Sequence, residues 1–194
     1  KRPGADHSSA EAIAKTLLRD LEAAAGDIPP GATGIVALDW INGRRTPYAN
    51  QGLTAAVSGL TLGTDAPSFL RALIEATAYG ARAIIECFES QGISIETVNA
   101  IGGVARKSPL SMQILADVTG RPIHVTANDQ SCAIGAAVFA ATAAGIYPDV
   151  TSAGKALAAG IGRIYQPDPK AHDTYNKLYE RYTRLGNFIE GELA

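Results

Sequence analysis

The chain has 194 residues, of which 46% are hydrophobic and 19% charged, and its net charge is −2. This composition is ordinary for a globular protein with a filled core, and without an excess of positive charge we expect no nucleic-acid partner. The most apolar stretch, residues 132–145, is shorter than the roughly 20 residues that span a membrane, and no signal-peptide pattern is present. The sequence therefore predicts a globular cytoplasmic protein without membrane contact.

Apolar periodicity, capping residues and glycine or proline stops divide the chain into elements. Helices are expected where apolar residues recur at helical spacing, at residues 8–25, 65–91, 108–119, 129–145 and from 169 onwards. Short apolar segments predict strands at residues 34–38, 97–101 and 122–126, and the intervening residues 39–63 predict a loop. Helices and strands alternate in the second half, which indicates an α/β layer with at least one parallel strand pair.

Isolated polar and sulfur-containing residues give little sign of chemistry. Cys87 and Cys132 lack the CxxC spacing of zinc sites, and we interpret both as small buried hydrophobes of a reduced protein. Glu75 and Glu86 fall on about the same face of one helix, where solvent contacts or ion pairs are expected rather than an acid–base pair. His124 lies on a predicted strand without an obvious partner. No metal site is predicted.

The most informative segment joins the strand at 97–101 to the helix at 108–119. Gly102 and Gly103 form a tight turn in this interpretation, and Ser108 precedes a proline at the first helical position. Glycines without a Cβ let a phosphate approach the backbone, while free N–H groups and the helix dipole favour negative charge. Lys107 would add a positive charge. A plain strand-to-helix connection needs the same glycines, so the residues alone leave both interpretations open.

This segment and its flanks resemble the adenosine motif of the FGGY family of carbohydrate kinases. The similar positions are 100–103, 105, 107–108, 112–113, 116–118, 120–123, 133–137 and 144–145, and the helix segments 69–72 and 75–80 upstream of them. Within the family, the ribulokinase branch is the most similar on three features: residues 38–40 with 42–45, residues 59–64, and residues 107–110 with 112–113. The similarity covers most of the chain from about Gly34 to Pro148.

The resemblance implies an α/β fold of the actin-like ATPase (ribonuclease H-like) class, with two lobes that close over ATP and a sugar. This chain would supply the C-terminal lobe of such a sugar kinase: an N-terminal helix (1–27), a nucleotide-binding domain (28–165) and a C-terminal helix (166–194). Gly102 and Gly103 would lie against the phosphates and ribose. The residues that would border the adenosine are Val104, Ala105, Lys107 and Ser108. Magnesium (Mg2+) would accompany the ATP.

The function implied is ATP binding within a ribulokinase, which phosphorylates L-ribulose to L-ribulose 5-phosphate. The alternatives are another FGGY kinase, for D-ribulose or xylulose, and a non-catalytic isolated lobe that acts as a binding module. In this family, the catalytic aspartate, the sugar pocket and the turn that grips the outer phosphates lie earlier in the full-length kinase than the region that this chain resembles. No residue here matches them, so no catalytic residue is predicted and this chain alone is expected to be inactive.

The implied partners are ATP, a ketopentose and the missing N-terminal kinase lobe. Without that lobe, an apolar patch near Gly102 and Gly103 would be exposed. Two copies of the chain could then associate through this face as a homodimer.

Overall fold

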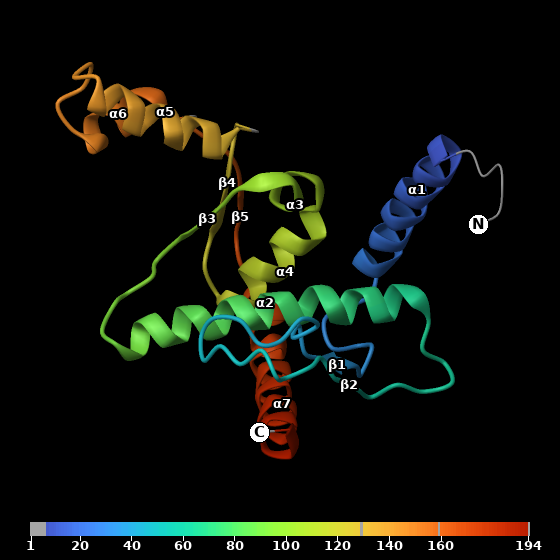
Figure 1. The fold of residues 1–194 in the computed structure, drawn as a ribbon. Coiled ribbons are helices and arrows are strands. Elements are labelled where there is room, and N and C mark those ends of the chain that lie inside the picture. The colour runs from blue at the N-terminus through green and yellow to red at the C-terminus, as the bar shows by residue number, and fades with distance from the viewer. Residues whose placement is uncertain (1–6, 129, 159, 194) are drawn as a thin grey trace.

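The structure is a computed structural model that describes residues 7–128, 130–158 and 160–193 (Figure 1). In chain order, its elements are α1 (His7–Gly26), β1 (Val36–Ala37), β2 (Val57–Ser58), α2 (Ala66–Ser90), β3 (Val98–Ala100), α3 (Gly102–Lys107), α4 (Pro109–Thr119), β4 (Ile123–Thr126), α5 (Ser131–Ala143), α6 (Val150–Leu157), β5 (Ile161–Tyr165) and α7 (Pro169–Leu193). The five predicted helices are all confirmed. For the fourth, the predicted start at Asp129 lies outside the described residues.

The long helix α2 crosses the middle of the molecule, with α3 and α4 on one side and β1, β2 and α7 on the other (Figure 1). Its start follows from the sequence: the Asp65 side chain accepts a hydrogen bond from the Ser68 N–H at 2.9 Å, and Pro67 occupies the first turn. The start of α7 is also capped, because Asp168 Oδ1 accepts from the Lys170 N–H at 2.7 Å. Helix α4 ends before Gly120, which adopts the left-handed conformation that favours glycine.

A three-stranded sheet has the order β3-β4-β5. Strand β3 is parallel to β4, with Val98 opposite Ile123, which confirms the predicted parallel pair. Strand β5 is antiparallel to β4 and was not predicted, because four of its five side chains are exposed and carry no alternating apolar pattern. Helix α6 and the short strand β2, inside the expected loop, were also missed.

The main core lies where α2, α4, α7 and β1 meet. Its buried members are Val36, Leu38, Trp40, Leu53, Ala78, Tyr79, Ile114, Val118, Tyr175, Leu178 and Tyr182. Tyr79 lies within 6.3 Å, centroid to centroid, of the rings of Tyr175, Tyr179 and Tyr182, so one aromatic cluster ties α2 to α7. A second, smaller core between α3, α4 and the sheet contains Ala105, Met112, Ala116, Ile123 and Val125. The last helix is therefore part of the folded unit and not a loose extension.

Both thiols are more exposed than predicted. Cys132, in the first turn of α5, is exposed, and Cys87 on α2 is only half-buried. The expectation of two buried cysteines is wrong, because α5 is apolar yet largely uncovered by the described residues. Within the described part of the chain, no helix combines the length and apolarity needed to cross a membrane.

Candidate functional site

The candidate site begins where β3 ends. Gly102 has a φ of 90°, in the left-handed region that favours glycine, and it turns the chain directly into α3. The predicted tight turn at Gly102 and Gly103 is thus wrong in detail: both glycines form the first turn of a short helix. That helix ends when the Ser108 N–H bonds the Val104 carbonyl at 2.9 Å. The backbone at both glycines is open, since a Cβ built there meets no heavy atom within 4 Å.

The six residues predicted to contact a nucleotide fall into an exposed group and a buried group. Gly102, Gly103, Val104 and Lys107 are exposed, while Ala105 and Ser108 are buried. The Ala105 methyl packs in the small core against the sheet. Four of the six (Gly103, Val104, Lys107 and Ser108) share a pocket of 460 Å³ with residues of α1, α2 and α4. Gly102 and Ala105 are not among its lining residues.

Ser108 joins three helices at the floor of this pocket. As the N-cap of α4, its Oγ accepts from the Ser111 N–H at 3.1 Å, which confirms the predicted helix start. The same hydroxyl donates a short hydrogen bond to the Glu22 carboxylate on α1. Sequence reasoning missed Glu22, since nothing in its local pattern distinguishes it from other polar residues of an amphipathic helix. The pocket therefore has one acidic and one basic side chain, Glu22 and Lys107.

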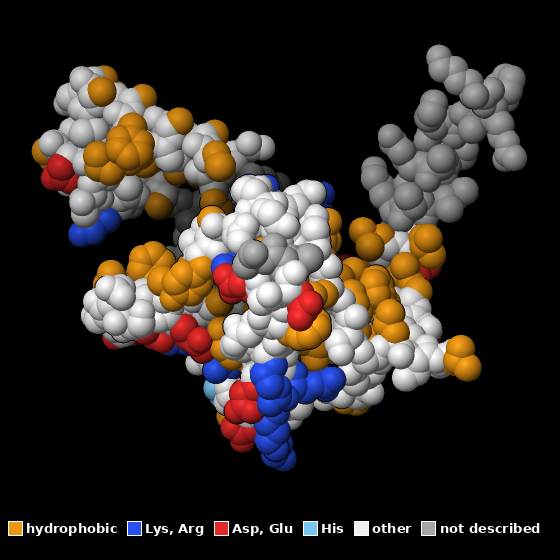
Figure 2. Space-filling model, turned by 60° about the horizontal axis from the view of Figure 1, so that its bottom comes forward, with side chains coloured by type: hydrophobic (Ala, Val, Ile, Leu, Met, Phe, Trp, Pro, Cys, Tyr) orange, Lys and Arg blue, Asp and Glu red, His pale blue; other side chains and the backbone are white. Residues whose placement is uncertain are grey.

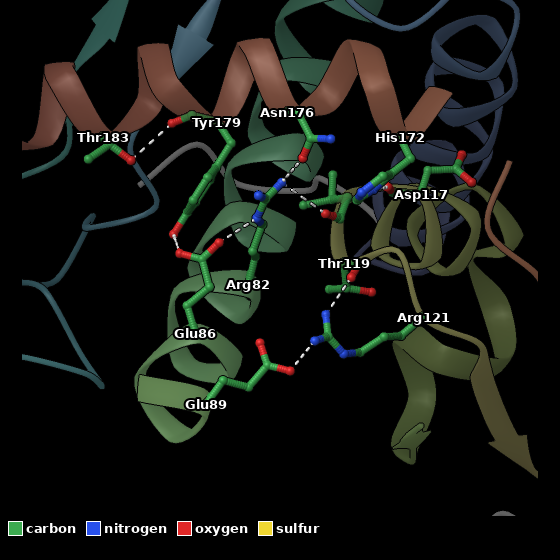
Figure 3. A network of polar contacts seen from close by, with 11 residues as sticks. Arg82, Glu86, Glu89, Asp117, Thr119, Arg121, His172, Asn176, Tyr179 and Thr183 are labelled. Atoms are coloured by element: carbon green, nitrogen blue, oxygen red, sulfur yellow. Dashed lines mark hydrogen bonds and ion pairs between the residues drawn. The ribbon is translucent and has the colours of Figure 1, made fainter. Parts of the chain in front are cut away.

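Gln113 and Asp117, two residues of the motif that resembles the kinase adenosine motif, connect α4 to the start of α7. The hydrogen bonds around Asp117 form what we call the α4–α7 latch. Asp117 Oδ1 accepts hydrogen bonds from Gln113 Nε2 and from the Asp168 backbone N–H, both at 2.8 Å. The Asp117 carbonyl lies 2.7 Å from Nδ1 of His172, one turn into α7 (Figure 3). Burial is the main cause that raises the pKa of Asp117 above its ordinary value. Gln113 and Asp117 therefore stabilise the fold next to the site and do not line the pocket.

This latch yields a prediction about pH. In Asp117→Asn, the new amide oxygen can accept both hydrogen bonds while the buried charge is removed, so we expect the variant to be at least as stable as the parent at pH 7. A carboxyl whose pKa is raised in the folded state stabilises the fold fully below its unfolded pKa of about 3.9, and that contribution is lost as pH rises through the folded pKa. The advantage of the variant should therefore vanish in acid. Urea unfolding at several pH values measures this, and a variant that becomes less stable than the parent as pH rises would contradict it.

A polar network continues from the latch across the face formed by α2, α4 and α7 (Figure 3). Arg82 Nε donates to Glu86 at 2.8 Å, and the other end of its guanidinium donates to Asn176 Oδ1 at 2.7 Å. The Tyr179 hydroxyl also donates to Glu86, at 2.9 Å. The predicted ion pairing of Glu86 is confirmed. Every charged side chain in this network has a hydrogen-bond partner. The network therefore holds α2, α4 and α7 together and offers no unpaired charged group for catalysis.

Metal ligands are not grouped in the described residues. No cluster of three or more His, Cys, Asp or Glu side chains that could hold an ion occurs among residues 7–128, 130–158 and 160–193. His124 lies on β4 of the small sheet and is half-buried there. The features that remain for a ligand are the open glycine backbone, Lys107 and the adjoining pocket, which suit an anion joined to a less polar group.

The known proteins to which this chain is similar are carbohydrate kinases. The profile of the FGGY family of carbohydrate kinases, C-terminal domain, matches residues 4–144. A ribulokinase of Vibrio parahaemolyticus is 48% identical over 182 residues, covering 94% of this chain and 32% of the relative. A ribulokinase of Anoxybacillus flavithermus is 41% identical over 87% of this chain and 31% of its own length. The chain thus spans about a third of the curated relatives that it matches.

Solved structures agree on the fold. The crystal structure of xylulose kinase from Rhodospirillum rubrum superposes with a TM-score of 0.78 at 28% identity, over 92% of this chain and 35% of that protein. The ligand-bound xylulose kinase from Lactobacillus acidophilus gives a TM-score of 0.78 at 25% identity, over 90% and 35%. The actin-like fold class expected from the sequence is confirmed by these neighbours. The chain therefore belongs to the FGGY family of carbohydrate kinases, as a C-terminal domain of that family.

Proposed function

We propose that this chain is the nucleotide-binding part of a ribulokinase, an enzyme that transfers the γ-phosphoryl group of ATP to L-ribulose. The observation that carries the proposal is the identity of 48% with a ribulokinase over 94% of the chain, which includes the β3–Gly102–Gly103–α3 unit. We assign residues 28–165 to the nucleotide-binding domain, with the segments 1–27 and 166–194 as its flanking helices. An N-terminal lobe that carries the sugar site and the catalytic base would complete the enzyme.

Charge supports a particular orientation of ATP. The Glu22 carboxylate in the pocket beside α3 would repel phosphates, so this pocket suits the uncharged adenosine. The phosphates would lie at Gly102 and Gly103, where no Cβ blocks the backbone and the first N–H groups of α3 are unpaired within the helix. Lys107 would border the adenosine on the solvent side. Ala105 and Ser108 would support this loop from within the fold, since both are buried.

Magnesium would reach this site with the nucleotide. Mg2+ usually keeps several waters and binds through one or two carboxylates together with substrate phosphates, and the described residues include no cluster of three or more side chains that could hold the ion by itself. When bound, the ion neutralises charge on the phosphoryl group in transfer. What this chain supplies is orientation of the nucleotide.

Gly103→Ala tests the nucleotide site. The added Cβ meets open space in the protein and Gly103 has no positive φ, so the fold should be as stable as the parent or slightly more stable. We expect ATP binding to weaken by roughly tenfold, or about 1.4 kcal/mol, because the methyl group occupies the approach of the phosphates. Isothermal titration calorimetry would measure binding. The protein used is a hybrid kinase, in which the N-terminal part of the Vibrio parahaemolyticus ribulokinase is joined to this chain in place of the matched residues.

Gly191→Ala is the matched control. Gly191 is also an exposed helical glycine whose Cβ would meet nothing within 4 Å, but it lies near the end of α7. Its substitution should leave ATP binding unchanged. Equal binding by Gly103→Ala and the parent would contradict the assignment of the phosphates to this turn. A panel of L-ribulose, D-ribulose and xylulose on the same hybrid separates ribulokinase from the other FGGY kinases.

A further inference from the structure

A second pocket lies on the side of α2 that faces α7 (Figure 1). Its walls come from the loop 39–48, from α2 between Thr77 and Ile84, and from α7 between Tyr179 and Asn187. We call it the α2–α7 pocket. Its volume of 470 Å³ falls within the roughly 300–1,000 Å³ of small-molecule sites. Among the described residues, it shares no lining residue with the pocket beside α3.

The walls of the α2–α7 pocket are largely aromatic and aliphatic. Trp40 is 7% exposed and Tyr182 6%, and Tyr179 and Ile84 are half-buried. Apolar side chains on the projecting part that contains α5 and α6 are spread over an open surface instead (Figure 2, upper left). A hollow with apolar walls and a few polar groups is the usual form of a small-molecule site.

Asp39 supplies the carboxylate of this pocket and lies very close to α2. Its Oδ1 accepts a hydrogen bond from the Tyr182 hydroxyl at 2.9 Å. Its Oδ2 packs against Gly80, in the middle of α2, where a Cβ would lie only 2.5 Å from this oxygen. Glycine is unfavourable inside a helix compared with alanine. The space that the Asp39 carboxylate occupies accounts for the glycine at this position.

The surroundings of Asp39 favour a ligand that donates hydrogen bonds. Burial is the largest influence on the pKa of Asp39 and raises it, while the hydrogen bond from Tyr182 opposes the rise. Removal from water thus makes the charged form of the carboxylate less favourable. Further donors from a ligand would stabilise that form, because an ionised carboxylate only accepts hydrogen bonds.

Two threonines in the walls are also limited to accepting. The Thr77 hydroxyl donates to the Ile74 carbonyl at 2.7 Å, and the Thr183 hydroxyl donates to the Tyr179 carbonyl at 3.0 Å (Figure 3). Each hydroxyl has a single hydrogen, so its oxygen is left to accept from a ligand. With Asp39, the pocket presents three acceptors. Several hydroxyl groups on one molecule would match them.

The charges around the pocket favour a neutral molecule. Arg44 donates to both carboxylate oxygens of Glu190, at 2.8 and 2.7 Å, and its guanidinium lies over the Trp40 ring. Its charge is therefore compensated within the protein. Arg45 also lines the pocket and balances the charge of Asp39. A cation or an anion would meet a like charge here as well as an opposite one.

We propose that the α2–α7 pocket binds a neutral sugar, whose hydroxyl groups donate to Asp39, Thr77 and Thr183. The carbon faces of the sugar would pack on the rings of Trp40 and Tyr182. This inference does not rest on the proposed function, because the pocket is built from this chain alone. Sugar binding by the chain and ATP binding by the hybrid kinase are separate measurements, so either result can fail without the other.

The pocket contains its own reporter. Trp40 is the only tryptophan of the chain, so a molecule that enters the pocket should change the tryptophan fluorescence. The 194-residue chain would be titrated with D-ribose, D-glucose and sucrose, up to about 10 mM, which covers weak millimolar binding. Choline and inorganic phosphate serve as cationic and anionic probes. We expect a saturable change with at least one sugar and none with choline or phosphate. The absence of a saturable change with any sugar, or its presence with choline or phosphate, would overturn the proposal.

Two substitutions test whether the sugar lies in this pocket. Asp39→Asn keeps an oxygen that can accept from Tyr182, so the fold should persist. The sugar should bind at least about tenfold more weakly, because a charged acceptor is replaced by a neutral one. Asp173→Asn, at an exposed position of α7 outside the pocket, is the matched control and should leave binding unchanged.

Thr183→Phe gives a second, independent variant. Thr183 is exposed on α7, so the larger side chain can be accommodated by the fold while it fills the pocket. We expect it to abolish the fluorescence change. Circular dichroism would show that each variant is folded. Unchanged sugar binding in a folded Asp39→Asn or Thr183→Phe variant would overturn the proposal.

Discussion

Glu75→Gln is expected to lower the free energy of unfolding by about 3–5 kcal/mol, because it removes one partner of an ion pair in the core. Glu75 is 2% exposed and Arg71 3%. Arg71 Nε donates to the Glu75 carboxylate at 2.9 Å, and its two other nitrogens donate to the Ala25 carbonyl and the Tyr175 hydroxyl. The substitution would leave the guanidinium buried without a counter-charge.

The pair joins three helices, since Arg71 and Glu75 lie on α2, Ala25 on α1 and Tyr175 on α7. The Tyr175 hydroxyl also donates to Glu75, at 3.1 Å. Burial is the largest influence on the pKa of Glu75 and raises it, while Arg71 and Tyr175 oppose the rise. Loss of the charge would therefore loosen the contact of α2 with both terminal helices.

Glu86→Gln is a closely matched control on the same helix. Glu86 also pairs with an arginine four residues earlier and also accepts from a tyrosine hydroxyl of α7, but its side chain is 46% exposed. Exposed pairs contribute about 0–1 kcal/mol, so the loss should stay within that range. Urea unfolding followed by circular dichroism measures both variants. Equal losses would show that burial does not decide the strength of these pairs.

Ile114→Ala should destabilise the fold by about 2–5 kcal/mol, as expected for a large-to-small change in a core. Ile114 is 2% exposed and belongs to the cluster that α4 shares with α2 and α7. The surrounding helices are held by the ion pair and by the latch at Asp117, so they can close the resulting cavity only in part. The same urea experiment measures the loss.

The control for Ile114→Ala is the same substitution on the surface. Ile146, after α5, is 69% exposed in this chain, and Ile146→Ala should change the free energy of unfolding by no more than about 0.5 kcal/mol. A small loss for Ile114→Ala would contradict a closely packed core between α2, α4 and α7.

The local sequence was sufficient to predict the elements whose ends carry capping residues or prolines. Helices α2 and α4 have an Asp or Ser cap followed by proline, and the parallel pair β3-β4 has the short apolar segments that such strands require. Strand β5 lacked such a signal, because it is exposed on most of its length and owes its position to β4. The start of α3 at Gly102 was missed because glycines weaken any helix pattern.

The site was only partly predictable for a different reason. Spacing along the sequence placed Ala105 and Ser108 next to Lys107, but a helix turns consecutive side chains to different sides, and these two face inward. Charged residues at helical spacing usually lie in solvent, so the burial of Arg71 and Glu75 could not be inferred without α7. The exposure of Cys132 likewise depends on which elements pack on α5, and a local sequence pattern does not record this.

The most direct test of the proposed function is the titration of the hybrid kinase with Mg–ATP, followed by an assay of phosphoryl transfer to L-ribulose. We predict that the folded hybrid binds ATP and converts L-ribulose to its 5-phosphate. Gly103→Ala should weaken the binding of ATP. A folded hybrid that binds no nucleotide would contradict the assignment of this chain as the ATP-binding part of a ribulokinase.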